Sequence, residues 1–191
     1  MKFILASASP RRRELLAAAR FDFDVVPSSV PEVHQPGESP EEYVARLSRD
    51  KAAVVAAQYL DRWVIAADTT VLMGDELLQK PVDAADARRM LAAIAGKTHM
   101  VYTGVTLQNA AAGFHETRVA ESEVRILPLT EREIDWYIAT GEPFDKAGAY
   151  AVQGIAAMFI DSVHGSFTNV VGLPLALLYQ MLRKAGIDPL V

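Results

Sequence analysis

The first feature that indicates the fold is the stretch KFILASASPRRRELLAAAR, residues 2–20. Its apolar beginning, residues 2–6, is typical of a buried strand. Ser9-Pro10 then offers a helix N-cap followed by a proline in the first turn, which predicts a helix to about Arg20. A strand that leads directly into a helix is a building block of α/β folds.

The rest of the chain continues this alternation. Capping boxes at Ser39/Glu42 and Thr130/Glu133 indicate helix starts, and glycines indicate helix ends. The polar run Asp68-Thr69-Thr70 interrupts an apolar segment, which suggests strands that meet or bend there. Helices are expected over 40–59, 84–95, 173–185 and between Thr130 and Gly141, and strands over 21–26, 63–73, 100–109 and 114–126. The predicted class is α/β with a mixed sheet.

Length and composition limit the classes of function. The chain has 191 residues, of which 51% are hydrophobic and 23% are charged, so a single globular domain over residues 1–191 is expected. The net charge is −5, which does not favour general binding to nucleic acid or to an anionic membrane surface. A polyanionic ligand would therefore have to be bound by local positive charge.

The absence of cysteine excludes disulfides, thiol catalysis and thiolate metal sites. The apolar run after Lys2 is too short for a secretory signal, and residues 162–182 contain glycine, proline and polar side chains unlike those of a membrane span. We therefore expect a cytoplasmic protein with no membrane partner.

Residues 7–13, Ser-Ala-Ser-Pro-Arg-Arg-Arg, lie where the first strand leads into a helix N-terminus. Backbone N–H groups and the helix dipole make such a place attractive to anions. Three arginines are unfavourable near that positive helix end, so their presence suggests that an anion binds between them. The alternative is a solvated arginine cluster. The segment is not a P-loop, because its glycine pattern is absent.

Asp68 follows the apolar run 64–67, so its carboxylate is expected to emerge at a strand end, where α/β folds place ligands. A turn or capping role is the alternative. Glu32 or Glu38 could supply a second carboxylate, and two carboxylates beside bound phosphates could hold Mg²⁺ or Mn²⁺.

Three lysines and one glycine-rich segment complete the candidate set. Lys51, Lys80 and Lys146 could meet phosphates, although surface lysines are usually only solvated. Residues 148–154, Gly-Ala-Tyr-Ala-Val-Gln-Gly, permit close backbone approach, and Gln153 offers a donor and an acceptor to a base edge.

Five blocks follow one another along this sequence, at residues 7–12, 67–69, 80–81, 145–154 and 172–174. Together they resemble the Maf family of nucleoside triphosphate pyrophosphatases, also known as septum formation inhibitors. The resemblance spans almost the whole chain. It implies hydrolysis of a nucleoside triphosphate between the α- and β-phosphates with a divalent metal. It also implies an elongated mixed sheet with helices and a central cleft between two lobes, as in the inosine triphosphate pyrophosphatases.

The resemblance also implies roles for individual residues. Asp68 is expected to accept the proton of the attacking water, and Glu32 with Asp68 to hold the metal. Whether Asp68 acts mainly as base or as metal ligand stays open. The expected phosphate-binding residues are Ser7, Arg12, Lys51 and Lys80, and the expected base-selecting residues are Arg11, Thr69 and Gln153.

Thr69 combined with Gln153 resembles the branch of the family that acts on dTTP and UTP. Uracil and thymine present acceptor, donor and acceptor along the pairing edge, which a glutamine amide and an arginine can satisfy. Cytosine would place a donor against a donor, which costs about 1 to 3 kcal/mol.

Three alternatives stay open at this level. The chain could be a non-enzymatic regulator of cell division that only senses nucleotide. The physiological substrate could be a normal or a modified pyrimidine nucleotide. The apolar C-terminal helix, with Leu177, Leu178, Met181 and Leu182, could belong to the core or form a homodimer face, and the core is preferred.

Overall fold

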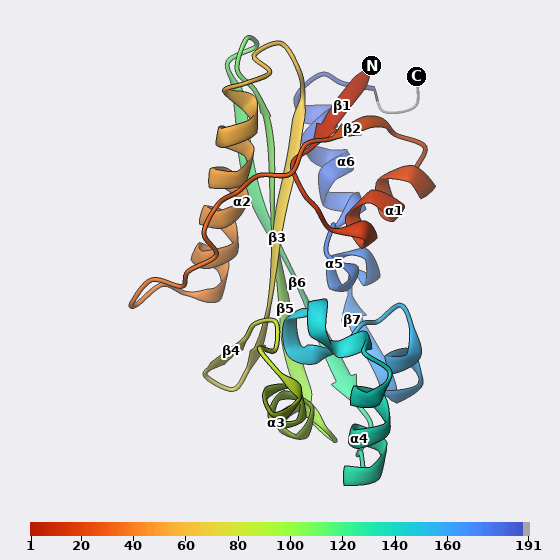
Figure 1. Cartoon of the computed structure of the whole chain (residues 1–191). Coiled ribbons are helices and arrows are strands. Elements are labelled where there is room, and N and C mark those ends of the chain that lie inside the picture. Colours follow the sequence, from red (N-terminus) through yellow and green to blue (C-terminus); the bar gives the residue numbers. More distant parts are fainter. Residues whose placement is uncertain (189–191) are drawn as a thin grey trace. The chain divides into compact units, whose positions relative to one another are not determined.

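The computed structural model describes residues 1–188 (Figure 1). Its strands and helices alternate as the sequence predicts, with additional short elements. The strands are β1 (Lys2–Leu5), β2 (Asp22–Val25), β3 (Val64–Met73), β4 (Glu76–Leu78), β5 (Thr98–Asn109), β6 (Phe114–Ile126) and β7 (Ile160–Gly165). The α-helices are α1 (Pro10–Ala18), α2 (Pro40–Ala56), α3 (Ala84–Ile94), α4 (Glu131–Ala139), α5 (Phe167–Val171) and α6 (Leu175–Lys184). Three 3-10 helices follow α4, namely η1 (Glu142–Asp145), η2 (Ala147–Ala149) and η3 (Ile155–Phe159).

The seven strands form a sheet of order β2-β1-β3-β5-β6-β7, with β4 paired to β3. β1 pairs in parallel with β2 and β3, whereas β4 and β7 pair antiparallel with their neighbours. The predicted α/β class with a mixed sheet is therefore confirmed.

The chain divides into two compact units. The first unit comprises Met1–Asp68, Thr103–Ala120 and Gly172–Val191, and the second comprises Thr69–Tyr102 and Glu121–Val171. The predicted arrangement of two lobes around a cleft stays a prediction.

In the first unit, α2 packs on β1 and β3. Residues Ile4, Val64 and Ala66 of the strands meet Ala52 and Val55 of the helix in one buried cluster. Figure 1 shows α1 and α6 on the opposite side of these strands from α2. Leu178, Met181 and Leu182 of α6 are fully buried, so they belong to the core, as the sequence analysis preferred.

In the second unit, the core forms between the strands and helices α3 and α4. It contains Leu91 and Ile94 of α3, Ile134 and Tyr137 of α4, and Val124 of β6. Within the described part of the chain, no helix is both long and apolar enough to cross a membrane.

Most of the predicted capping signals mark real helix starts. Both predicted capping boxes form, with Ser39/Glu42 at α2 and Thr130/Glu133 at α4. Ser9 occupies the N-cap position of α1 as predicted, but its side chain makes no cap hydrogen bond. The last helix starts at Leu175 rather than Leu173, because Pro174 occupies its N-cap position.

One prediction about the sheet was wrong. β3 is a single strand of ten residues that runs through Asp68, so the strand neither ends nor is replaced by a second strand at that point. Asp68 therefore does not emerge at a strand end. Its pairing with Lys51 explains how a carboxylate can occupy the middle of a buried strand.

Candidate active site

Asp68 lies near the middle of β3, preceded by four fully buried residues, Val64 to Ala67. Only 5% of Asp68 is exposed. A buried carboxylate is costly unless a charged or hydrogen-bonding partner compensates it, so the surroundings of Asp68 decide what this site can do.

The partner of Asp68 is Lys51 of α2. Helical spacing places Leu47, Lys51 and Val55 on the helix face that is buried against the sheet. Lys51 is 6% exposed, and its Nζ donates to Asp68 Oδ1 at 2.6 Å. Lys51 is buried because it lies on the apolar face of α2, and the Asp68 carboxylate of β3 balances its charge.

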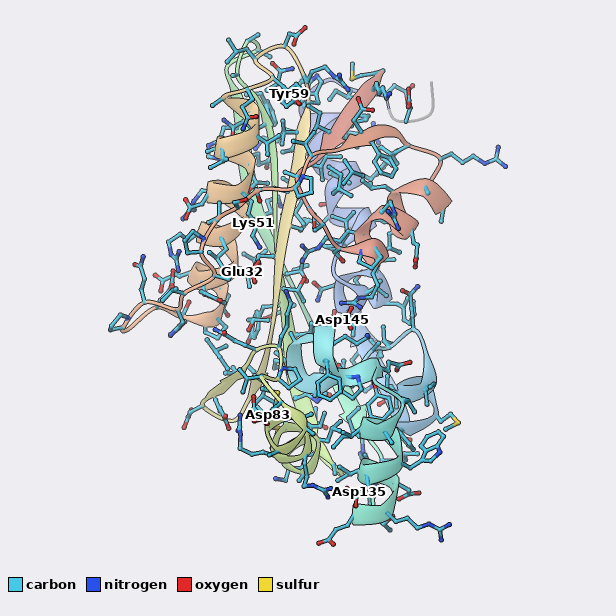
Figure 2. The ribbon with its side chains drawn as sticks, viewed as in Figure 1. Glu32, Lys51, Tyr59, Asp83, Asp135 and Asp145 are labelled. Atoms are coloured by element: carbon cyan, nitrogen blue, oxygen red, sulfur yellow. The ribbon has the colours of Figure 1, made fainter. Side chains whose placement is uncertain are left out.

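A second carboxylate meets the same ammonium. Lys51 Nζ also donates to Glu32 Oε1 at 2.5 Å, and Figure 2 shows Glu32 on the loop beside Lys51. Two carboxylates and one ammonium thus share a small volume, with one formal negative charge in excess.

The structure also distinguishes Glu32 from Glu38. The Glu38 carboxylate is bound in a bidentate manner by Arg46, with Nε at 2.6 Å and Nη2 at 2.8 Å. The hydrogen bond from Arg46 is the main cause that lowers the pKa of Glu38. Of the two candidates, only Glu32 meets Lys51 together with Asp68 among the hydrogen bonds of the described residues.

Tyr43, which the sequence analysis did not identify, connects the Glu32 loop to α2. Its hydroxyl donates to the Glu32 carbonyl oxygen at 3.3 Å. Burial and then the negative charges of Asp68 and Glu32 raise the pKa of Tyr43 to about 12. The phenol therefore stays protonated as a donor. Its place on the buried face of α2, four residues before Leu47, was the signal available in the sequence.

Arg12 is the buried member of the arginine cluster. It is 9% exposed, and its Nε donates to the Gly172 carbonyl oxygen at 2.7 Å. Its Nη1 donates to Ser7 Oγ at 3.2 Å, and Ser7 Oγ also accepts the backbone N–H of Ser9. These bonds fix the plane of the guanidinium at the start of α1.

Burial lowers the pKa of Arg12, while the charges of Asp68 and Glu32 oppose that shift. The guanidinium nevertheless stays charged. The first unit therefore assembles Ser7, Arg12, Glu32, Lys51 and Asp68, with Arg11 half-buried in the first turn of α1.

Three of the predicted site residues belong to the second unit, namely Thr69, Lys80 and Gln153. Thr69 directly follows Asp68 in β3, and Lys80 and Gln153 are exposed on loops. Lys146, the third candidate lysine, donates to the Glu142 carbonyl oxygen at 2.6 Å and pairs with Asp145. Lys146 thus stabilises its own loop.

Glycine is required at Gly148 of that loop. Gly148 has a φ of +73°, and a Cβ there would lie 3.1 Å from Val71 Cγ2. Its backbone N–H donates to the Gln79 carbonyl oxygen at 3.2 Å, which ties this segment to the residue before Lys80. The close approach that the glycine pattern predicted is therefore to the protein's own β3 and to the Gln79 backbone.

The donor set of the first unit fits a divalent cation. Carboxylate oxygens are the ligands that Mg²⁺ and Mn²⁺ prefer, and Glu32 and Asp68 already share one cationic group, the Lys51 ammonium. No group of three or more His, Cys, Asp or Glu side chains suited to a metal occurs among residues 1–188. Two carboxylates are enough for Mg²⁺ when water and phosphate complete the shell.

Comparison with known proteins identifies the family. The model of the Maf family, described as Maf-like protein, matches residues 2–185. A protein of Koribacter versatilis named dTTP/UTP pyrophosphatase is 49% identical over 187 residues, covering 98% of this chain and 96% of that protein. A protein of the same name from Myxococcus xanthus is 50% identical over 185 residues, covering 96% and 92%.

Among solved structures, the Staphylococcus aureus Ham1 protein matches with a TM-score of 0.51 and 12% identity, covering 97% of this chain and 100% of that chain. At this identity the likeness concerns the fold alone, and it agrees with the α/β class. The family model matches nearly the whole sequence, and relatives about 50% identical align over more than 90% of both chains. This chain therefore belongs to the Maf family.

Proposed function

We propose that this chain hydrolyses nucleoside triphosphates between the α- and β-phosphates, with dTTP and UTP as preferred substrates. The products are the nucleoside monophosphate and pyrophosphate. The observation that carries the proposal is the cluster in which the buried Lys51 binds both the buried Asp68 and the exposed Glu32. Full-length relatives named dTTP/UTP pyrophosphatase support the choice of substrate.

In this proposal Asp68 accepts the proton of the attacking water. The water oxygen forms a bond to the α-phosphorus, the bond from that phosphorus to the bridging oxygen breaks, and pyrophosphate leaves. The hydrogen bond from Lys51 Nζ holds the Asp68 carboxylate in place, and a proton acceptor has to be positioned in this way. Tyr43 holds the loop that carries Glu32.

A divalent cation, Mg²⁺ or Mn²⁺, is part of the proposal. Glu32 and Asp68 would hold it, and when bound it would neutralise phosphate charge. Asp68 would then serve both as proton acceptor and as ligand.

Phosphate binding falls to Arg12, Ser7, Lys51 and Lys80 in this scheme. Arg12 is fixed by Gly172 and Ser7, so little side-chain entropy is lost when it binds a phosphate. Positive charge near the leaving pyrophosphate stabilises the transition state.

Base selection falls to Arg11, Thr69 and Gln153. An arginine donor and a glutamine amide match the acceptor–donor–acceptor edge of uracil and thymine. A methyl group at C5 does not disturb this edge, so both UTP and dTTP are accommodated. The reaction takes place in the cytoplasm, where nucleotide pools are found, and a homodimer stays a further expectation.

The proposal is tested by pyrophosphate release from UTP, dTTP, CTP, GTP, ATP and 7-methyl-GTP with Mg²⁺ or Mn²⁺. The Asp68→Asn variant should lower kcat about 10²- to 10⁴-fold, because it removes the proton acceptor while keeping the side-chain shape. Asp50→Asn is the matched control, since Asp50 lies on α2 beside Lys51 but is exposed.

Release from UTP and dTTP that is lost in Asp68→Asn and kept in Asp50→Asn is the expected result. If no nucleotide releases pyrophosphate although UTP binds, the chain is a nucleotide sensor, and the regulator of cell division becomes the better account.

A further inference from the structure

Gln153 lies on a loop, and the structure shows what holds that loop. Gln153 is exposed between η2 and η3, and the next residue, Gly154, has a φ of +135°. Such a loop needs fixed contacts if the side chain that it presents is to discriminate between bases. The contacts come from Glu142, the first residue of η1.

The Glu142 carboxylate binds the backbone immediately after Gln153. Its Oε2 accepts the N–H of Ile155 at 2.9 Å, and its Oε1 accepts the N–H of Ala156 at 3.2 Å. Ile155 and Ala156 are the first two residues of η3, and N–H groups at a helix start have no acceptor within the helix. The Glu142 carboxylate supplies the missing acceptors.

The carboxylate is itself held from α4. The buried hydroxyl of Tyr137 donates to Glu142 Oε1 at 2.8 Å, and the Tyr137 ring packs edge-on against Phe159 at the end of η3. Burial raises the pKa of Glu142, but hydrogen bonds from Ile155, Ala156 and Tyr137, with the charge of Lys146, lower it overall. Glu142 is therefore ionised at neutral pH and accepts all three bonds.

Gly154 allows this close approach. A Cβ at residue 154 would lie 2.6 Å from Glu142 Oε2 and 2.9 Å from its carboxyl carbon. Residue 154 is therefore a glycine for two reasons: a side chain would collide with the Glu142 carboxylate, and the positive φ favours glycine.

We propose that Glu142 is a positioning residue for base selection, which holds the 153–156 backbone so that Gln153 meets the pyrimidine edge in one orientation. This inference rests on the proposed function. Glu142 acts through Gln153 and does not itself touch the substrate.

Substitution of Glu142 by glutamine is the sharpest perturbation. A glutamine keeps the volume but has one acceptor oxygen and one NH₂ donor in place of two acceptor oxygens. In either orientation of the amide, the NH₂ donor would face a backbone N–H, that of Ile155 or that of Ala156. The loop should lose its single orientation while the rest of the unit stays folded.

The experiment measures kcat and KM for UTP and CTP in the wild type, Glu142→Gln, Gln153→Ala and the double variant. Glu142→Gln should lower the UTP/CTP ratio of kcat/KM about 5- to 10-fold, mainly through a higher KM for UTP. The double variant should show no further loss beyond Gln153→Ala, because both changes act on one interaction.

Glu133→Gln is the matched control. Glu133 also accepts a backbone N–H, that of Thr130 at 2.7 Å, but it does so at the start of α4. This variant should keep the wild-type ratio. A fall of equal size in Glu133→Gln would overturn the inference, because it would show a general effect of weakening this unit.

The remaining outcomes separate the inference from the proposed function. If Gln153→Ala lowers the ratio and a folded Glu142→Gln does not, the positioning role is wrong and the proposed function stands. If Gln153→Ala leaves the ratio unchanged, base selection by Gln153 is wrong and the inference falls with it.

Should Glu142→Gln fail to fold, Tyr137→Phe carries the test, since it removes the hydroxyl that donates to Glu142 and that also makes a hydrogen bond with the Ala151 backbone, two residues before Gln153. That variant should lower the UTP/CTP ratio about 2- to 3-fold. An unchanged ratio in folded Tyr137→Phe would then count against the inference.

Discussion

The two units hold their candidate residues in different ways. In the first unit, the candidate residues hold one another, since Lys51 binds Glu32 and Asp68 through charged side chains. In the second unit, Gln153 is exposed and is held indirectly, by a carboxylate that binds the backbone after it. An ionic cluster built on the buried pair of Lys51 and Asp68 suits chemistry at a fixed atom. A loop held through its backbone instead leaves the Gln153 side chain available to bind a ligand.

This difference predicts which property of the protein a substitution in each unit should change. Changes in the ionic cluster should reduce turnover and stability together, because each charge compensates another. Changes around the Gln153 loop should alter the choice of base more than the rate of hydrolysis.

The largest effect is expected for Lys51→Met, which leaves the buried Asp68 carboxylate and the exposed Glu32 carboxylate without their shared ammonium. We expect a loss of about 3 to 5 kcal/mol in the free energy of unfolding and a fall in kcat with UTP of about 10²-fold or more. Urea unfolding and steady-state kinetics measure the two quantities. Lys2→Met is the control, because Lys2 pairs with Asp24 and both side chains are about half exposed, so this variant should cost at most about 1 kcal/mol. Equal stability of both variants would contradict the account of the cluster.

The second effect concerns pH and the buried core of the second unit. Burial lowers the pKa of His99 from 6.5 to about 4, and its Nε2 lies 2.8 Å from the Tyr150 hydroxyl. Between these values the unfolded chain binds a proton that the folded chain does not, so stability falls as pH decreases from 6.5 to 4. At about 1.4 kcal/mol per pKa unit, the loss is up to about 3 kcal/mol.

His99→Gln should remove this part of the pH dependence of the unfolding free energy. His164→Gln, at an exposed histidine of β7, should keep it. Unfolding curves at pH 4.5 and 7 distinguish the two outcomes. If the unfolding free energy of His99→Gln changes between pH 4.5 and 7 as much as that of the wild type, a group other than His99 causes the pH dependence.

A smaller effect is expected for Gly154→Ala. The added Cβ meets the Glu142 carboxylate, and the φ of +135° is strained for alanine, so a cost of about 1 to 3 kcal/mol follows. The UTP/CTP ratio of kcat/KM should fall as in Glu142→Gln, with kcat for UTP less affected. Gly113→Ala, at another positive φ but with open space around it, is the control for strain alone. A fall in selectivity in both variants would mean that strain, not the Glu142 contact, is responsible.

The smallest effect is expected for Glu38→Gln, which weakens the bidentate pair with Arg46 at the base of the Glu32 loop. We expect a loss of about 1 kcal/mol or less in stability and a change in KM for UTP of about 2- to 3-fold. Thermal unfolding and kinetics check this. A loss of turnover as large as that of Lys51→Met would indicate that Glu38, rather than Glu32, is the second carboxylate.

Local signals explain why much of the fold could be predicted. The capping boxes at Ser39 and Thr130 involve residues three positions apart, so the sequence alone contains both partners. The same holds for the apolar run that forms β1. The Asp68 error arose because Lys51, which allows a carboxylate inside a strand, lies 17 residues away.

The sequence alone indicates only part of the candidate site, because the partners that decide each residue's role are distant in the sequence. The choice between Glu32 and Glu38 depends on Arg46, and the role of Glu142 depends on backbone N–H groups 13 and 14 residues later. Backbone N–H and carbonyl groups leave no mark in residue types, so Tyr43 and Glu142 were missed. Asp68 and Gln153 were singled out from the sequence around them, an apolar run before Asp68 and two glycines that flank the Gln153 segment.

The most direct test of the central claim is hydrolysis of UTP in water enriched in heavy oxygen, followed by mass analysis of both products. Attack on the α-phosphorus predicts one heavy oxygen in UMP and none in pyrophosphate. The Asp68→Asn variant should bind UTP and release neither product at a comparable rate. Heavy oxygen in pyrophosphate, or unchanged release by Asp68→Asn, would contradict the account.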